Sequence, residues 1–413
     1  MSRVVVVGGG GREHALAWGL ARDAQVVVTP GNDGIAAHGI TCSPEPATAL
    51  EADLVVVGPE APLVAGLADE LRARGVPVVG PGADGARLEG SKAYLKEFLA
   101  AAGVATAAHG TFADEAAARA HLAAMAPPYV IKTDGLAAGK GVLVTSSRAE
   151  AEADVADKLA GRSFGEAGRT VVIEEGLTGV ECSLMLLCDG ERTVSLTPAQ
   201  DFKRVGDGDR GANTGGMGAF APLALPDDTL ARVEREIVAP TLAELHRRAI
   251  DYRGVLYAGL MLTAQGPKLL EYNVRFGDPE TQVLVPLVRE DLLDLLVATA
   301  AGHLTPAPVA RRGAAVTVVL AAPGYPEAPV AGGRITGLGP DGQLAEPLEG
   351  VVVFHAGTRR DADGAFVSAG GRVLSVTAHA DTVAAARARA YEAVARIEVP
   401  GAIWRRDIAA GAS

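Results

Sequence analysis

The chain has 413 residues, 48% of them hydrophobic and 21% charged, with a formal net charge of −12 at pH 7. This length allows about two to four domains. The acidic balance argues against a general nucleic-acid or anionic-membrane surface, so an anionic substrate must meet locally placed cations. No apolar run is long enough to span a membrane. Three cysteines without disulfide spacing and a strand-like N-terminus favour a reducing, cytoplasmic setting.

The N-terminal part has the alternating strand and helix pattern of an open parallel sheet. The β-branched run Arg3–Val7 predicts a buried parallel strand, and it leads through Gly8–Gly11 into a helical segment, Arg12–Ala21. A strand, a glycine turn and a helix open a Rossmann-like fold, in which the helix N-terminus faces an anion. We therefore expect a ligand at the carboxyl ends of these strands.

The same stretch departs from a dinucleotide-binding fingerprint. Glu13 stands at the third glycine position, and the strand Gln25–Thr29 is followed by Pro30-Gly31-Asn32, without an acid for a ribose of NAD. A phosphate-bearing sugar fits this loop better than a dinucleotide, with Gly10 and Asn32 as the expected contacts. A tight turn without any ligand is the alternative.

Two further strands, Asp53–Val57 and Val76–Val79, and a helix over Leu63–Arg74 continue this sheet. The loop after the first of these strands carries Glu60 toward the crevice of the sheet. Glu60 is either a hydroxyl acceptor for a sugar or a first-turn acid that favours the N-terminus of the helix.

Lysines gather in stretches that suit a phosphate-rich ligand. The helix expected over Ser91–Ala101 has Lys92 in its first turn, where a cation is locally unfavourable, so we expect Lys92 to have an anionic partner. The strands Tyr129–Lys132 and Gly141–Thr145 predict a hairpin whose glycine-rich loop ends in Lys140. The loop does not have the spacing of a P-loop, but a hairpin with two lysines can close over a triphosphate as a lid.

Acidic side chains follow this hairpin. The strand Thr170–Glu175 ends in two acids, and the next strand, Val180–Leu187, alternates so that Glu181 and Ser183 share a face. The segment Thr197–Pro222 is too long for a structureless loop inside a compact domain. Its apolar residues and its polar mixture predict an ordered substrate loop, with three candidate contacts, Asp201, Lys203 and Asn213.

The stretch Leu269–Glu280, LLEYNVRFGDPE, alternates between two faces. Three polar residues at spacing two, Glu271, Asn273 and Arg275, share one face, and Leu270, Tyr272 and Val274 form an apolar face that can pack. Carboxylate and amide oxygens suit Mg²⁺, and an arginine can hold a transferring phosphoryl group. The turn that follows carries Asp278, which we expect to act in catalysis. A half-exposed edge strand is the alternative.

A small α+β domain is expected at the C-terminus. Leu304–Arg312 has the composition of a linker, and strands at Ala314–Ala321, Val351–His355 and Arg372–Thr377 precede a helix over Val383–Ile397. The predicted organisation is an N-terminal domain at 1–103, a central domain at 104–303 with a lid at about 112–176, and a C-terminal domain at 313–413.

Long stretches of the chain resemble the ATP-grasp superfamily, and within it the phosphoribosylamine–glycine ligase family. They are VVVVGGGGREHALAW, VGPEAPLVAGL, LEGSKAYLKEFL, YVIKTDGLAAGKGV, VVIEE, DFKRVGDGDRGANTGGMGAF and LLEYNVRFGDPE. The resemblance implies a PreATP-grasp domain, a central ATP-grasp domain and a small C-terminal domain, so the fold class is α/β and α+β multidomain.

The resemblance also implies roles for particular residues. Glu271 and Asn273 match the family's Mg²⁺ or Mn²⁺ ligands, and the preceding strand, Ala258–Leu262, offers no second carboxylate for another ion. The implied ATP contacts are Lys92, Lys132, Lys140, Glu174, Glu175, Leu177 and Glu181.

The implied reaction joins glycine to 5-phosphoribosylamine at the expense of ATP, through a glycyl phosphate, and yields glycinamide ribonucleotide, ADP and phosphate in purine biosynthesis. Small molecules are the only expected partners, without nucleic acid or membrane, and the sequence leaves a monomer or a larger assembly open. Other ATP-grasp enzymes acting on bicarbonate or a carboxylated imidazole, a nucleotide-binding protein without turnover, and an NAD oxidoreductase are the alternatives.

Overall fold

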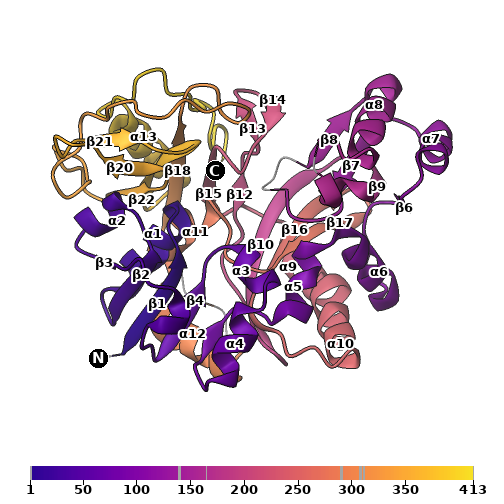
Figure 1. Ribbon diagram of the computed structural model, residues 1–413, viewed down its shortest axis with the longest axis horizontal. Coiled ribbons are helices and arrows are strands. Elements are labelled where there is room, and N and C mark those ends of the chain that lie inside the picture. The colour runs from indigo at the N-terminus through magenta and orange to yellow at the C-terminus, as the bar shows by residue number, and fades with distance from the viewer. Residues whose placement is uncertain are drawn as a thin grey trace.

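The computed structural model describes residues 2–137, 141–163, 165–288, 292–306, 309 and 312–412. Four of its sheets have four or five strands. Figure 1 shows the N-terminal sheet at the lower left, the C-terminal domain above it and the lid at the upper right. Across the described ranges, no helix combines the length and the apolar character that crossing a bilayer requires.

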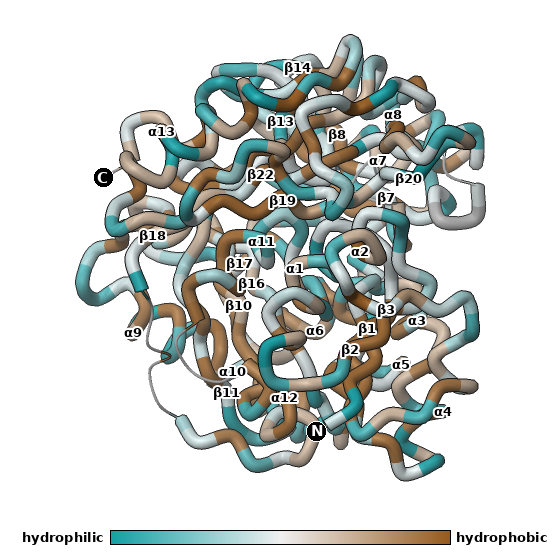
Figure 2. The backbone as a smooth tube through the Cα atoms, turned by 90° about the vertical axis from the view of Figure 1, so that its left-hand side faces the viewer, coloured by the Kyte–Doolittle hydropathy of each residue, from teal (hydrophilic) through white to brown (hydrophobic). Residues whose placement is uncertain are grey.

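The N-terminal sheet is parallel with the strand order β3-β2-β1-β4-β5. Its central strands are covered on both faces, so Val4, Val5 and Val6 are fully buried; in Figure 2 β1 and β2 run as hydrophobic, brown segments. The predicted helix Leu63–Arg74 is wrong in its extent, because Gly66 at φ +88° separates two shorter helices. The elements are β1 (Arg3–Gly8), α1 (Gly11–Leu20), β2 (Gln25–Pro30), α2 (Asp33–Ala37), β3 (Thr41–Cys42), a 3₁₀ turn (Ala47–Ala49), β4 (Leu54–Val57), α3 (Glu60–Val64), α4 (Leu67–Ala73), β5 (Val78–Val79), α5 (Ala83–Gly90) and α6 (Lys92–Ala102).

The lid is an antiparallel sheet with the strand order β6-β9-β7-β8 and two helices on it. The predicted hairpin is present, since β7 pairs with β8, and the lid has a small hydrophobic core of its own. Lys140 lies outside the described residues. The elements are β6 (His109–Phe112), α7 (Glu115–Ala124), β7 (Tyr129–Thr133), β8 (Val142–Thr145), α8 (Arg148–Leu159), a 3₁₀ turn (Gly165–Arg169) and β9 (Val171–Glu175).

The central sheet, β11-β10-β16-β17, contains a bulge at its most polar strand. Gly259 pairs with Glu271 but Leu260 pairs with Leu269, so Leu270 is the extra residue. The predicted packing of Leu270 is therefore wrong: Leu269 is fully buried, whereas Leu270 is only partly buried. The elements are β10 (Val180–Asp189), β11 (Thr193–Ser195), α9 (Thr229–Val233), a π-helical turn (Glu234–Val238), α10 (Ala239–Arg247), β16 (Arg253–Thr263), β17 (Gly266–Asn273), α11 (Glu280–Leu284), a 3₁₀ turn (Val285–Leu287) and α12 (Leu292–Ala301).

The substrate loop, Thr197–Pro222, is ordered as predicted, and it links two domains. Its last strand, β15, pairs with β18, so the C-terminal sheet has the order β12-β15-β18-β22-β19. The predicted domain limits stay a prediction, and two strands of the central segment, β12 and β15, lie within the C-terminal sheet. The elements are β12 (Gln200–Asp201), β13 (Arg204–Gly206), β14 (Arg210–Asn213), β15 (Gly218–Ala221), β18 (Ala314–Ala321), β19 (Val351–His355), β20 (Thr358–Arg360), β21 (Phe366–Ser368), β22 (Arg372–Ala380) and α13 (Val383–Val394).

Buried histidines join the N-terminal and C-terminal domains. His14 on α1 accepts the backbone N–H of His355 at 2.9 Å through Nδ1, and its Nε2 lies 2.9 Å from Nδ1 of His38. His355 contacts the Thr358 hydroxyl at 2.9 Å and the Gly342 carbonyl at 2.8 Å. Burial lowers the pKa of His14 well below its ordinary value and the pKa of His355 to about 4, so both rings are neutral near pH 7.

This interface should make the fold sensitive to acid. The unfolded chain protonates His355 near pH 6.5, whereas the folded chain does so near pH 4, so the unfolded state binds more protons between these values. The free energy of unfolding should therefore fall as the pH falls through this window, by about 2 kcal/mol at about pH 5 from His355 alone. Urea denaturation at several pH values measures this slope. It should flatten in His355→Gln and stay unchanged in His246→Gln, which alters an exposed histidine; equal slopes in both variants would contradict the interpretation.

Candidate active site

A cleft of about 870 Å³ opens between the N-terminal domain, the lid, the central sheet and the substrate loop. The structure brings most of the sequence-predicted site residues to its wall, although they come from distant parts of the chain. Those that line it are Glu60, Lys92, Lys132, Glu174, Glu175, Leu177, Glu181, Asp201, Lys203, Asn213, Glu271, Asn273, Arg275 and Asp278. Gly10 and Asn32 are not part of this lining.

The metal-suited face of β17 is strongly charged. Burial alone would raise the pKa of Glu271, but Lys203, Lys132, Lys92 and Arg275 outweigh it and lower that pKa to about 2, so the carboxylate is ionised. Within the described ranges, no group of three His, Cys, Asp or Glu side chains forms a ready-made metal cage. One carboxylate and one amide oxygen fit Mg²⁺ or Mn²⁺ that completes its coordination with water and phosphate oxygens.

Arg275 is held between two acids. Its Nη2 lies 2.9 Å from Glu89 Oε1 and donates to Asn273 Oδ1 at 3.1 Å, and its Nε lies 3.4 Å from Glu60 Oε2. Burial would lower the pKa of Arg275, but Glu89 and Glu60 raise it, so the guanidinium stays charged. Glu60 therefore has a counter-ion in this structure, and the missed residue Glu89 fixes the direction of the arginine.

Glu174 is the shared counter-ion of two lysines. Its two carboxylate oxygens each lie 3.0 Å from a lysine Nζ, one from Lys96 and the other from Lys132, and all three side chains are buried. Lys132 also donates to the carbonyl of the bulged Leu270 at 3.3 Å. The carboxylate of Glu174 therefore orients the ammonium group of Lys132. Lys96, which sequence analysis missed, lies on the apolar face of α6.

The substrate loop brings a cation to the acids on the other side of the cleft. Lys203 Nζ lies 3.1 Å from Glu181 Oε2 and 3.9 Å from Asp201 Oδ1. Burial would lower the pKa of Lys203, but Asp201, Glu181 and Glu271 raise it well above its ordinary value. Burial raises the pKa of Asp201, and the nearby carboxylate of Glu280 adds to this effect while Lys203 opposes it.

The side-chain carboxylate of Glu13, from the first turn of α1, folds back onto the glycine-rich turn after β1. Glu13 Oε2 accepts the backbone N–H of Gly10 at 2.6 Å, and Glu13 Oε1 lies 2.6 Å from Arg12 Nε. A Cβ on Gly58 would lie 2.0 Å from this carboxylate, so Glu13 fills the space beneath Gly58. An acid therefore occupies the helix N-terminus where a dinucleotide fold binds pyrophosphate, which argues against the NAD alternative.

Asn32 has a structural role. Its Oδ1 accepts the N–H groups of Gly34 and Ile35 and caps α2, while its Nδ2 donates to the Gly9 carbonyl at 2.8 Å and the Ala356 carbonyl at 3.1 Å. Through these contacts, the Asn32 amide joins the glycine-rich turn after β1 to the C-terminal domain. They leave the predicted sugar contact of Asn32 without support.

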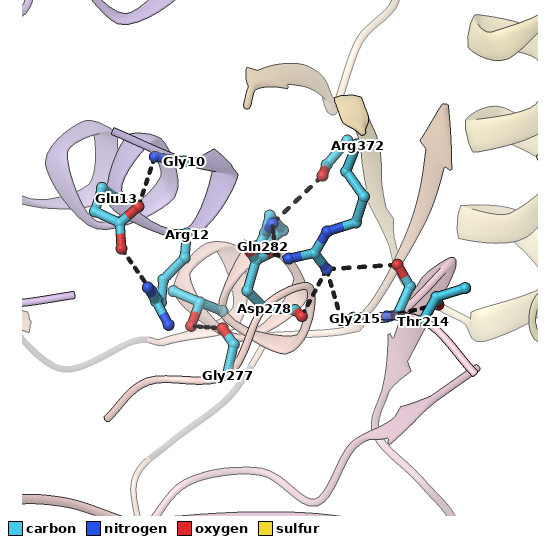
Figure 3. Close-up of polar contacts among 12 residues, drawn as sticks. Gly10, Arg12, Glu13, Thr214, Gly215, Gly277, Asp278, Gln282 and Arg372 are labelled. Carbon is cyan, nitrogen blue, oxygen red and sulfur yellow. Dashed lines mark hydrogen bonds and ion pairs between the residues drawn. The ribbon is translucent and has the colours of Figure 1, made fainter. Parts of the chain in front are cut away.

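Asp278 anchors the C-terminal domain at the cleft, as Figure 3 shows. Arg372 Nη2 lies 2.9 Å from Asp278 Oδ2, and Nη1 donates to the carbonyls of Asp278 and Gly215 at 2.8 and 2.6 Å. Gln282 Nε2 donates to Asp278 Oδ1 at 2.7 Å. Burial would raise the pKa of Asp278, but Arg372 and Arg12 lower it. Arg372 was missed because its only sequence signal is a short Gly-Gly-Arg run.

Comparison with known families decides what this cleft belongs to. Three family models match in chain order: the N domain of phosphoribosylglycinamide synthetase at residues 2–89, its ATP-grasp (A) domain at 90–281 and its C domain at 315–411. The chain belongs to the phosphoribosylamine–glycine ligase family. It is accordingly an ATP-grasp ligase, and the resemblance seen in the sequence, the predicted fold class and the expected ATP-dependent ligation in purine biosynthesis are confirmed.

Individual relatives agree with this assignment. The chain is 50% identical to a phosphoribosylamine–glycine ligase of Phenylobacterium zucineum, with 98% of each chain covered. It is 48% identical to one of Caulobacter vibrioides over 98% of this chain and 97% of the other. A crystal structure of the ligase from Thermotoga maritima superposes with a TM-score of 0.87 at 39% identity, covering 98% of this chain and 100% of that one.

More distant structures share the fold alone. The biotin carboxylase domain of Hydrogenobacter thermophilus 2-oxoglutarate carboxylase has a TM-score of 0.72 at 17% identity, covering 98% of this chain and 91% of that one. The likeness shows a shared fold, and it carries no information on the substrate.

The Lys96–Glu174–Lys132 cluster gives a test of stability. Lys96→Met should lower the free energy of unfolding by about 3 kcal/mol, because it removes one partner of a buried ion pair and leaves the carboxylate less compensated. Lys268→Met is the matched control, since Lys268 meets Glu175 at 3.3 Å in a more exposed pair, and it should cost less than about 1 kcal/mol. Urea denaturation of both variants measures the difference, and equal losses would contradict the assigned role.

Proposed function

We propose that this ligase joins glycine to 5-phosphoribosylamine, using ATP, and releases glycinamide ribonucleotide, ADP and phosphate. One observation carries the proposal beyond family membership: Glu271, Asn273 and Arg275 line the same cleft as the lid lysine Lys132 and the substrate-loop lysine Lys203. This arrangement suits a reaction in which a nucleotide and an acceptor must meet at one phosphoryl group.

The nucleotide is proposed to bind between the lid and the central sheet. Three large hydrophobic side chains that line the cleft there remain exposed, Leu136 at 36%, Val144 at 37% and Val180 at 49%. A purine base would cover this apolar surface. The other proposed ATP contacts are Lys92, Lys132, Glu175, Leu177 and Glu181, together with Lys140, which lies outside the described residues.

The proposed chemistry has two steps and needs no side-chain nucleophile. The glycine carboxylate attacks the γ-phosphorus of ATP, forming glycyl phosphate and ADP; the sugar amine then attacks the glycyl carbonyl, loses a proton, and phosphate leaves. Arg275, held in direction by Glu89 and Asn273, is placed to stabilise the transferring phosphoryl group and the following oxyanion.

A Mg²⁺ or Mn²⁺ ion, held by Glu271 and Asn273, would draw negative charge from the β- and γ-phosphates. On the acceptor side, Asp201, Lys203 and Asn213 are proposed to contact glycine or the sugar phosphate. Asp278 is proposed to act there with Arg372, beside the N-terminus of α1 and Gly10.

We further propose a cytoplasmic location and a monomer as the functional unit. Among the described residues all three cysteines are free thiols, and burial raises the pKa of Cys182 and Cys188 to about 12, which fits inert thiols in a reducing compartment. The described residues of one chain already bring the metal-suited strand, the lid lysine Lys132 and the substrate-loop lysine Lys203 to one cleft, which supports a monomer as the functional unit.

The purified protein tests this function directly. With ATP and Mg²⁺, phosphate release should require both glycine and phosphoribosylamine, and the product should carry the glycyl group on the sugar amine. Bicarbonate and carboxylated imidazoles serve as alternative substrates, since other ATP-grasp enzymes act on carboxylates of that kind. Phosphate release that ignores glycine and the amine, or that prefers bicarbonate, would refute the proposal.

Two substitutions on β17 separate the metal role from the phosphoryl role. Glu271→Gln keeps the shape but removes the charge, so the Mg²⁺ concentration for half-maximal rate should rise more than about tenfold. Arg275→Ala should lower kcat/KM about 100-fold, or about 3 kcal/mol, while affecting ATP affinity less. Steady-state rates over a Mg²⁺ series distinguish them, and an identical Mg²⁺ requirement in the two variants would contradict the division of roles.

A further inference from the structure

The hairpin formed by β13 and β14 lacks a sheet to support it. We call residues Arg204–Asn213 the substrate hairpin; its two strands pair with each other and form a separate two-stranded sheet. Three of its residues, Arg204, Asp209 and Asn213, line the cleft, while its tip is exposed. An isolated hairpin is marginally stable in water, so its position over the cleft must depend on contacts with other segments.

The C-terminal segment supplies such contacts through a buried arginine. Arg405 is only 1% exposed, and its Nε and Nη2 lie 2.7 and 2.6 Å from the two carboxylate oxygens of Asp407. Its Nη1 lies 2.6 Å from Asp209 Oδ1 on the substrate hairpin, and its guanidinium carbon lies 4.8 Å from the ring centre of Phe202. A buried arginine is rare unless every charge has a partner, and here one partner is the hairpin.

Backbone groups complete the attachment from both sides. Asp407 Oδ2 accepts the N–H of Gly208 at 2.8 Å, and Asp207 Oδ1 accepts the N–H of Arg406 at 2.7 Å. We call residues Arg405–Asp407 the C-terminal clasp. The clasp and the tip of the substrate hairpin each accept a backbone N–H from the other. Figure 1 shows β13 and β14 near the top of the view, next to the C-terminal domain.

The clasp is fixed to its own domain by other atoms. The Tyr391 hydroxyl on α13 donates to the Arg405 carbonyl at 2.8 Å, and Arg387 on the same helix donates to the carbonyls of Arg406 and Ile408 at 2.7 and 2.9 Å. Ile408 is fully buried in the C-terminal core. The backbone of the clasp is therefore anchored without the hairpin, and the side chains of Arg405 and Asp407 contact the hairpin.

We propose that Arg405 and Asp407 are positioning residues for the acceptor side of the active site. They hold the substrate hairpin at the cleft and, through Phe202 and the base of the hairpin, set the position of Lys203 and Asn213. The proposal rests on the function proposed above, in which Lys203 and Asn213 contact glycine or the sugar phosphate. It assigns a role to a stretch at the end of the chain that carries no catalytic group.

Two variants test the clasp from its two sides. Asp209→Asn keeps the shape and suits the positive φ of 56° at this position, because asparagine tolerates the left-handed region. Arg405→Lys keeps the charge but loses the two-pronged contact with Asp407. Arg406→Ala is the matched control, since Arg406 is exposed and contacts the hairpin through its backbone N–H.

Hydrogen exchange of the amides at 204–213 is the direct readout. Exchange there should accelerate about fivefold in Asp209→Asn and about tenfold or more in Arg405→Lys, with the central sheet unchanged and Arg406→Ala like the wild type. The KM for glycine or for phosphoribosylamine should rise by a similar factor while the KM for ATP stays within about twofold.

Unchanged hairpin exchange in both Asp209→Asn and Arg405→Lys would overturn the proposal. So would an equal rise in KM for ATP and for the acceptor substrates, which is the result expected of a general loss of structure. Phosphate release by the wild-type protein tests the proposed function separately. If the wild type has no such activity, hydrogen exchange alone still decides whether the clasp positions the hairpin.

Discussion

The charged face of β17 is the constraint on which the rest of the structure depends. Glu271 and Arg275 are partly buried in the cleft, where an unpaired charge is unfavourable. Each is stabilised by groups from other segments: Lys132 from the lid, Lys92 from α6 and Lys203 from the substrate loop act on Glu271, while Glu89 from α5 pairs with Arg275. The domains therefore meet at this strand, where their charged side chains compensate the charges of Glu271 and Arg275.

The local parts of this arrangement were predictable, and the long-range parts were not. Alternation in the sequence correctly placed Glu271, Asn273 and Arg275 on the cleft, because the side-chain period of a strand is a local property. The bulge at Leu270 was missed, since it arises from pairing with β16 and leaves no mark in the spacing of β17. It matters for the site, because the bulged carbonyl receives Lys132.

The ion-pair partners of the site residues were the part that the sequence did not predict. The family resemblance implies an ATP contact for Glu174, which stays a prediction, and the structure adds that Lys96 on α6 and Lys132 hold its carboxylate. Glu89 and Arg275 are 186 residues apart, and a single sequence contains no signal for such a pair. Family resemblance supplied the fold and the expected chemistry of the motifs, whereas the counter-ions that orient those motifs became visible only in three dimensions.

The C-terminal domain is an integral part of the cleft. It provides the strand β18 that receives β15, the guanidinium of Arg372 that joins Asp278 to Gly215, and the buried His355 that meets α1. These contacts reach the substrate loop, the turn that carries Asp278 and the N-terminal domain. A change in the packing of this domain would therefore alter the acceptor side first, because the lid has a separate core and contacts the opposite side of the cleft.

The number of ligands that β17 offers also orders the binding events under the proposed function. The cations that keep Glu271 ionised are themselves paired with acids: Lys203 with Glu181, Lys132 with Glu174 and Arg275 with Glu89. The strand offers a metal ion one carboxylate and one amide oxygen, whereas a triphosphate adds the oxygen ligands that Mg²⁺ prefers. The small number of protein ligands therefore favours entry of the metal with the nucleotide.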